Sequence, residues 1–227
     1  MTADATAHVE DGGSIIYMPA FLSRSEADRL LALLLHEPAS TTRQSPVAVA
    51  ASDSGKISKR TRSARRDVSD AIAWKQEHGR FGRPFPRLTA LYGDPGVCYT
   101  YSGTKYDCLP WTPELALIRR RVEEAAKAPM NSVLLNRYRD GQDSMGFHAD
   151  DEPELGKNPI LPSISLGAER RFVLRHTRSG RRLEYVLGHG SLLIMAGTLQ
   201  HFWQHALPKT KDEVGERVNL TFRRIHS

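Results

Sequence analysis

A short triplet, His148-Ala149-Asp150, combines two residue types that bind transition metals. On an extended segment, residues two apart point to the same side, so the imidazole and the carboxylate converge while Ala149 faces away. A second histidine brought close by the fold would complete two histidines and one carboxylate on one side of a metal, an arrangement typical of non-haem iron(II) oxygenases. The chain has nine histidines, so the triplet alone also fits a surface turn. From spacing, the second histidine stays open between His201 and His205.

The C-terminal segment Arg217–Arg224 predicts a strand with two different faces. Its alternation is strict, and the apolar face must pack on a core. That face carries Val218, Leu220 and Phe222, and the opposite face carries Arg217, Asn219, Thr221 and Arg223. Two arginines and an amide on a rigid strand suit a dicarboxylate ligand. The alternative is the solvent-facing side of an edge strand.

Helices are predicted on both sides of a long polar stretch. Ser23 and Glu26 form a capping box, and the leucines from Leu30 to Leu35 make an apolar face that ends before Pro38. Thr112 and Pro113 open a second helix as N-cap and first residue, and this helix ends before Pro129.

Short strands separated by turns dominate the rest of the chain. Besides an extended segment at Ile15–Met18, the predicted strands are Val133–Tyr138, Ile164–Leu166, Arg171–His176, Arg182–Leu187, Ser191–Met195, Phe202–Ala206 and Arg217–Arg224. Ser179-Gly180 is the expected tip of a hairpin. Asn136 and Tyr138 share one face of their strand. Strands this short indicate an α+β, mainly β fold, with a double-stranded β-helix (jelly roll) core and flanking N-terminal helices.

Two segments fall outside these periodic patterns. Residues 1–14 are expected to form a disordered tail, and residues 15–227 a single domain. Within that domain, residues 39–68 are small, polar and then densely basic, which indicates a mobile insert. Its lysines and arginines either touch phosphates or belong to a solvated linker.

Composition narrows the class of protein. The 227 residues carry a net charge of +6, which favours a polyanionic partner such as nucleic acid. Cys98 and Cys108 are the only cysteines, so a reducing, cytoplasmic location fits better than a disulfide scaffold. No apolar run is long enough for a membrane helix, and no secretion signal is expected. Nothing indicates an obligate protein partner.

Several motifs follow one another along the chain in the order PRLTALYGDPG, YTYSG, NRYRDGQDSMGFHADDEPELG, SISLGA, HGSLLIMAG, FWQHALP and RVNLTFR. Together they resemble the AlkB family of iron(II)- and 2-oxoglutarate-dependent nucleic-acid dealkylating dioxygenases. The resemblance covers residues 81–227, and more loosely 15–37. It implies oxidative demethylation of N1-methyladenine- or N3-methylcytosine-type bases in DNA, with Fe(II), 2-oxoglutarate as cosubstrate and O2.

The resemblance also assigns roles to residues. His148 and Asp150 match two iron ligands, and the Trp-x-His position of the third falls on His205. His201 would then either contact the ligands from behind or lie on the surface. The cosubstrate residues implied are Asn136, Tyr138, Arg217, Asn219 and Arg223. Arg217 is expected to meet the far carboxylate, and Arg223 the metal-side end or Asp150. The remaining histidines, His176 and His189 among them, are expected to be ordinary surface or loop residues.

Substrate contacts are implied at two further places. Tyr99 and Tyr101 match aromatics that lie against the flipped base, and Asp151 and Glu152 supply negative charge for a cationic methylated base. Phe81 stands where duplex-acting members carry a wedge in a hairpin, although the spacing to the next motif is shorter here. A turn or core phenylalanine is the alternative.

Three other functions remain in competition. The same chemistry acting on RNA, or on a protein or small molecule, would need the same cofactor residues. A non-catalytic nucleic-acid-binding module would have no use for all of His148, Asp150, His205, Arg217 and Arg223. A metal hydrolase would leave the arginine-bearing strand without a role.

Overall fold

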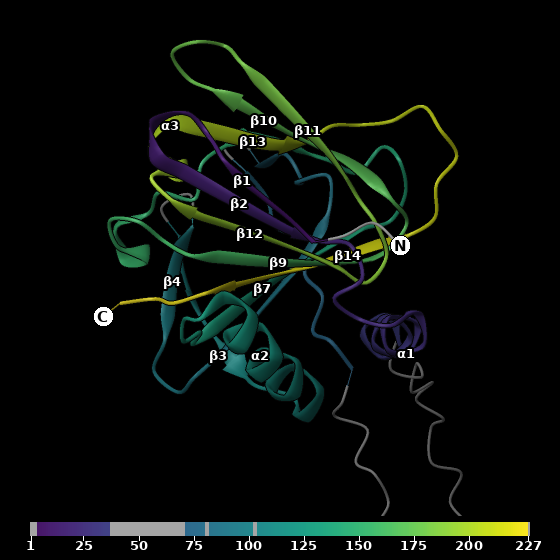
Figure 1. The fold of residues 1–227 in the computed structure, drawn as a ribbon. Helices are drawn as coiled ribbons and strands as arrows, with labels where there is room; N and C mark the ends of the chain where they lie inside the picture. Colours follow the sequence, from purple (N-terminus) through teal and green to yellow (C-terminus); the bar gives the residue numbers. More distant parts are fainter. Residues whose placement is uncertain (1–3, 37–70, 80–81, 102–103, 227) are drawn as a thin grey trace, which may run out of the picture.

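Two facing β-sheets form the body of the protein in a computed structural model, which describes residues 4–36, 71–79, 82–101 and 104–226 (Figure 1). For residues 99–101 and 104–106 the description is limited to the backbone. In this part of the chain the larger sheet has eight strands in the order β1-β2-β12-β9-β14-β7-β3-β6. Their bounds are Ala5–His8, Gly13–Met18, Ser191–Gly197, Leu161–Gly167, Arg217–Arg223, Ser132–Tyr138, Leu88–Gly93 and Leu109–Pro110.

The smaller sheet lies across the large one and has the order β11-β10-β13-β8. Its strands are Arg182–Leu187, Arg170–His176, Trp203–Leu207 and Met145–His148. A separate hairpin pairs β4 (Cys98–Tyr101) with β5 (Thr104–Asp107). Two mainly antiparallel sheets face to face confirm the predicted jelly-roll core.

Strand β14 lies in the middle of the large sheet, because it pairs with β7 on one side and with β9 on the other. All of its residues are buried, including both arginines. The edge-strand alternative is therefore wrong. The polar face of β14 points into the space between the two sheets, and its apolar face packs against the helices.

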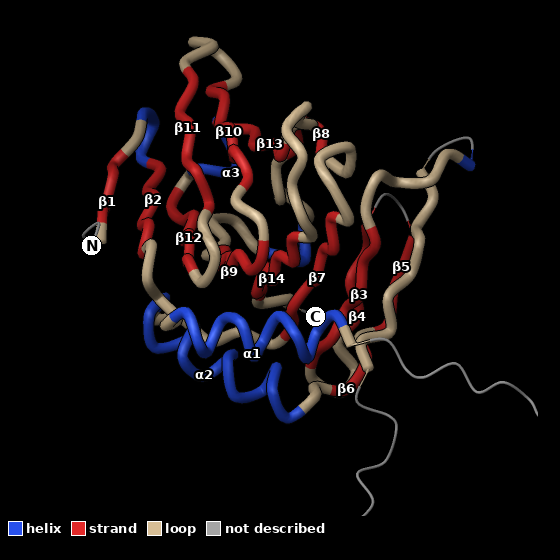
Figure 2. Tube along the Cα trace, turned by 90° about the vertical axis from the view of Figure 1, so that its right-hand side faces the viewer, coloured by secondary structure: helices blue, strands red, loops and turns tan. Residues whose placement is uncertain are grey.

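Both predicted helices form with the expected caps. Helix α1 (Arg24–Leu35) is capped by Ser23, and the capping box of Ser23 with Glu26 is complete. Helix α2 (Pro113–Ala126) is capped by Thr112, whose hydroxyl oxygen accepts a hydrogen bond from the Leu115 amide. The two helices lie together against one side of the large sheet (Figure 2). Short helical turns η1 (Glu10–Gly12), η3 (Pro153–Leu155) and α3 (Leu199–Phe202) complete the described elements.

The core divides into two main layers around the large sheet. On the helix side, Leu34 of α1 and Val122 of α2 pack with Phe222 of β14. Between the sheets, Leu174, Leu193 and Trp203 belong to a second cluster. Because the large sheet is covered on both sides, polar groups on its inner face are withdrawn from bulk water.

The predicted disorder of residues 1–14 is wrong for the described part of that segment. Residues 5–8 form β1, which pairs with β2. Asp11 accepts a hydrogen bond from Nε2 of His176, 2.9 Å away, and His176 is only 2% exposed. His176 is therefore a buried structural histidine and not a surface one. Backbone pairing and this buried contact supply the order that the polar sequence did not reveal.

The predicted strands all form, with ends that move by a few residues. Phe202 is an exception, since it ends α3 and β13 begins at Trp203. Strands β1, β3, β4, β5, β6 and β8 were not predicted. The proposed insert at 39–68 lies outside the described residues. No helix in the described part of the chain is long and apolar enough to cross a membrane.

Candidate metal centre

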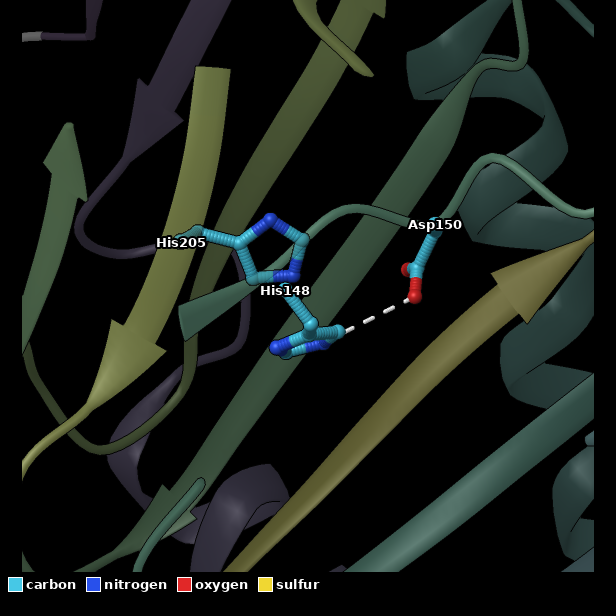
Figure 3. A group of neighbouring side chains, drawn as sticks. All are labelled: His148, Asp150 and His205. Atoms are coloured by element: carbon cyan, nitrogen blue, oxygen red, sulfur yellow. Dashed lines mark ion pairs between the residues drawn. The ribbon is translucent and has the colours of Figure 1, made fainter. Parts of the chain in front are cut away.

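Neighbouring strands of the small sheet bring two histidines together. His148 on β8 is paired in register with His205 on β13, and their ring centroids are 4.2 Å apart. Asp150 follows β8 directly, with its Oδ1 3.7 Å from Nε2 of His148. The possible ligand atoms of the three side chains all lie within 4.8 Å of one another (Figure 3). One small ion can therefore contact all three.

The structure brings His205, and not His201, to the predicted pair. His201 is exposed on α3, and its Nε2 lies 3.0 Å from Oδ1 of Asn158. His205 is buried and points between the sheets, because it sits on the inward-facing register of β13. The ambiguity between two histidines four residues apart is thus resolved by secondary structure, because His201 lies on α3, whereas His205 lies on β13 opposite His148.

Hydrogen bonds orient the candidate ligands. Nδ1 of His148 lies 2.9 Å from the carbonyl of Gly146, which can accept a hydrogen bond from the protonated Nδ1 and so leave Nε2 with a free lone pair. The amide of Asp150 donates to Oε1 of Gln200 at 3.0 Å, and Nη2 of Arg223 donates to Oδ2 of Asp150 at 3.2 Å. Such contacts fix ligand geometry before a metal arrives.

Burial and local charges keep Asp150 and His205 in their metal-binding protonation states. Burial opposes ionisation of Asp150, but the charge of Arg223, followed by His205 and His148, lowers the pKa of this carboxyl well below its usual value. Burial, together with neighbouring His148, lowers the pKa of His205 to about 3. At neutral pH the site therefore offers a carboxylate and a neutral imidazole, which are the forms that bind a metal.

The other end of the same cavity is built for an anion. Arg217 is 2% exposed, and no carboxylate of the described residues lies within ion-pair distance of it. Its Nη2 donates to Oγ of Ser165 at 2.9 Å, and its guanidinium lies 5.2 Å from the ring centre of Tyr138. Its Nε is buried without a hydrogen-bond partner. A buried cation with an unused donor calls for an anionic acceptor, which a ligand carboxylate supplies.

Two predicted cosubstrate residues differ in how much hydrogen-bonding capacity they retain. Asn219 donates to Oγ of Ser163 and to the carbonyl of Ile164, and its Oδ1 accepts the Thr221 hydroxyl. Its amide hydrogens are therefore used within the chain. Asn136, by contrast, keeps its Nδ2 without a partner among the described residues and lines the cavity.

The cavity has an empty volume of about 570 Å³, part of it open to solvent, and unites the metal and anion ends. Its lining includes Asn136, Tyr138, His148, Asp150, His205, Arg217, Asn219 and Arg223, together with apolar residues such as Phe172 and Met195. A second cavity of about 670 Å³ shares Leu134 with it and is lined by Glu77, Phe85 and Asp107 among others.

The predicted substrate residues are only partly described. Asp151 is exposed and Glu152 half-buried just after Asp150, and neither lines the metal cavity. Tyr99 and Tyr101 lie on β4, and their side chains are not among those described. Phe81 is outside the described residues. The backbone on either side of it forms a hairpin, in which the Gly79 amide donates to the Arg83 carbonyl.

Gln200 is a site residue that the sequence did not reveal. It lies 50 residues from Asp150 and holds that residue's amide from a buried position. A glutamine before a histidine-rich segment has no spacing that distinguishes it from a surface residue. Only the fold, which places Gln200 of α3 beside Asp150, makes the contact visible.

Comparisons with known proteins agree with this geometry. A family model described as the 2OG-Fe(II) oxygenase superfamily matches residues 14–223. The DNA oxidative demethylase ALKBH2 of Bos taurus is 45% identical over 163 residues, which cover 68% of this chain and 58% of that protein. The corresponding protein of Mus musculus is 44% identical, with 68% of each chain covered. The alpha-ketoglutarate-dependent dioxygenase alkB homolog 3 of Rattus norvegicus is 42% identical over 168 residues, covering 68% of this chain and 56% of that one.

A solved structure described as "The structure of OsALKBH1" has the same fold, with a TM-score of 0.61 and 17% identity over 97% of this chain and 100% of that one. The chain belongs to the 2OG-Fe(II) oxygenase superfamily and, within it, to the AlkB family. This superfamily uses iron(II), 2-oxoglutarate and O2. The residues present fit these groups, because the three candidate ligands and the unpaired Arg217 donor share one cavity.

Proposed function

We propose that this protein removes N-methyl groups oxidatively from nucleobases of DNA, using iron(II), 2-oxoglutarate and O2. The observation that carries the proposal is the union of His148, Asp150 and His205 with the buried Arg217 in one cavity. A metal site alone fits many reactions. A metal site that shares its cavity with a buried arginine lacking an ion-pair partner among the described residues fits a cosubstrate that binds metal at one end and presents a carboxylate at the other.

Each residue has a defined task in this proposal. His148, Asp150 and His205 hold the iron, and Arg223 keeps Asp150 ionised and oriented. Arg217 and Tyr138 receive the far carboxylate of 2-oxoglutarate, and Asn136 donates to the cosubstrate through its unpaired Nδ2. Asn219 acts mainly by bracing β9, because its own donors are already used.

Bound iron would activate O2, which is the oxidant: one oxygen atom would convert a methyl group on nitrogen into a hydroxymethyl group, and the other would enter succinate as 2-oxoglutarate loses CO2. The hydroxymethyl product is a hemiaminal, which releases formaldehyde and leaves the repaired base. The chain contributes position and exclusion of water, since apolar Phe172 and Met195 line the metal cavity. No side chain is needed as a general base in this scheme.

The lining of the second cavity suits an extruded base. It adjoins the metal cavity at Leu134, combines apolar Phe85 with carboxylates Glu77 and Asp107, and lies next to the β4–β5 hairpin. A cationic methylated base suits aromatic and carboxylate surroundings. Tyr99, Tyr101, Asp151 and Glu152 stay predicted contacts for the base, and Phe81 a predicted wedge for duplex DNA.

DNA is favoured as the polymer by two observations. The net charge of +6 suits a polyanion, and relatives at 44–45% identity are named DNA oxidative demethylases. The alternative is the same chemistry on RNA or on a substrate other than nucleic acid. A cytoplasmic location stays an expectation, supported by two cysteines that are both free.

Formaldehyde release from defined oligonucleotides tests the proposal. The purified protein, with iron(II) and 2-oxoglutarate, would be given N1-methyladenine or N3-methylcytosine in single-stranded DNA, duplex DNA and RNA. We expect the highest rate on one of the DNA substrates. A faster rate on RNA would move the substrate assignment to RNA, and no release from any nucleic acid would refute the repair function.

A matched pair of histidine variants separates catalysis from mere DNA binding. His148→Ala should abolish 2-oxoglutarate turnover and leave DNA affinity nearly unchanged, because affinity for DNA comes mainly from contacts to phosphates. His201→Ala is the control, since His201 is an exposed histidine close in sequence that does not reach the metal cavity. Turnover that survived His148→Ala would show that the ligand assignment is wrong.

A further inference from the structure

A buried arginine outside the predicted site residues makes direct contact with the cosubstrate end of the cavity. Arg87 is 4% exposed and directly precedes β3. Its Nε donates a hydrogen bond to Oδ1 of Asn136 at 2.9 Å. Asn136 lines the metal cavity, whereas Arg87 lines the second cavity. The pair therefore forms part of the wall between the two.

This contact determines which way the Asn136 amide faces. A guanidinium has donors only, so the amide must turn its oxygen toward Arg87. The amide nitrogen is then directed away from Arg87, and it has no partner among the described residues. Without Arg87 the Asn136 oxygen would lose this donor, and a flipped amide would turn that oxygen toward the cavity, where it would repel a ligand carboxylate.

Arg87 is itself held firmly. Nε2 of Gln76 donates to the carbonyls of Phe85 and Arg87 at 2.6 and 3.1 Å, which fixes the backbone on both sides of Pro86. The guanidinium carbon lies 5.0 Å from the ring centre of Phe85, a stacked arrangement that restricts its rotation. A rigid donor can orient an amide, whereas a mobile one cannot.

We propose that Arg87 is a positioning residue for cosubstrate binding, which acts by locking the Asn136 amide with its donor toward 2-oxoglutarate. The proposal rests on the function proposed above only in naming the cosubstrate. Because Arg87 also walls the second cavity, an acceptor group bound there would compete for the same guanidinium. The two cavities are thus linked through one hydrogen bond.

Binding of 2-oxoglutarate without any nucleic acid tests this role. Titration calorimetry on the full chain loaded with Mn(II), a redox-inert substitute, gives the dissociation constant. We expect Arg87→Met to weaken 2-oxoglutarate about ten-fold, the effect of losing one charge-assisted hydrogen bond, and Arg87→Lys to weaken it less. Arg83→Met, an exposed arginine of the same hairpin, should leave binding unchanged.

A double-mutant cycle distinguishes positioning from general damage. If Arg87 acts through Asn136, adding Arg87→Met to Asn136→Ala should weaken binding by less than about two-fold. An undiminished loss in that background would overturn the proposal, as would unchanged binding by both Arg87 variants. Should Arg87→Met fold poorly, Arg87→Lys in the same cycle carries the test. If the unaltered protein bound no 2-oxoglutarate, both the role of Arg87 and the proposed function would be refuted. If the protein bound 2-oxoglutarate but released no formaldehyde from DNA, only the proposed function would be refuted.

Discussion

Replacing Arg217 with methionine should change stability and cosubstrate binding in opposite directions. In the ligand-free protein the guanidinium is buried with no carboxylate partner among the described residues, and burial lowers its pKa to about 10. Holding this charge in the folded state costs about 3 kcal/mol. Methionine has a similar length and no charge, and exchanging a buried charge for an apolar group is often stabilising.

The net gain should be smaller than the full cost of the charge. The variant loses the hydrogen bond from Arg217 to Ser165, worth about 1 kcal/mol. We therefore expect the ligand-free variant to be more stable by about 1–2 kcal/mol, equivalent to a melting temperature a few degrees higher. Loss of the charged contact to the far carboxylate, about 3 kcal/mol, should weaken 2-oxoglutarate about a hundred-fold.

Thermal unfolding with and without 2-oxoglutarate, combined with titration calorimetry, measures both effects. Arg171→Met is the control, because Arg171 is an exposed arginine paired with Glu184 at 3.2 Å and should affect neither quantity much. A variant that melted at a lower temperature and bound 2-oxoglutarate normally would refute the reasoning, since Arg217 would then be a structural cation.

Three further outcomes are expected. Gln200→Leu should weaken metal binding at least about ten-fold in a chelator competition, because the buried Asp150 amide loses its acceptor; normal affinity would show that this contact does not orient the ligand. Ser23→Ala should lower the free energy of unfolding in urea by about 1 kcal/mol through loss of the α1 cap. Gly167→Ala should cost more than about 2 kcal/mol in the same assay, because φ is +86° and a Cβ would collide with the Glu216 carbonyl.

The sequence predicted those parts of the fold that depend on local patterns. Both helices carry N-caps and apolar faces at helical spacing, which are patterns specific to helices. The alternation of residues in β14 correctly predicted its polar and apolar faces. Strands with weaker alternation, such as β3 and β8, were missed. Their pairing partners lie far along the chain, so the stabilising contacts leave little trace in the local sequence.

Polar composition predicted disorder at the N-terminus, and this prediction is wrong for the described residues. The first residues are polar, yet β1 adds to the edge of the large sheet and Asp11 bonds the buried His176. Backbone hydrogen bonds do not depend on side-chain polarity, which is why a polar segment can still form a strand.

For the functional site, the sequence by itself determined the residue types: a histidine and a carboxylate two apart, and arginines on one face of a strand. Tertiary structure decided which groups meet. Pairing of β8 with β13 selects His205 over His201, and the central position of β14 turns Arg217 from a possible surface charge into a buried, unpaired one. Spacing along the chain determines which nearby side chains share a face of a strand or helix. Burial and strand register, by contrast, are set only when strands distant in sequence pair.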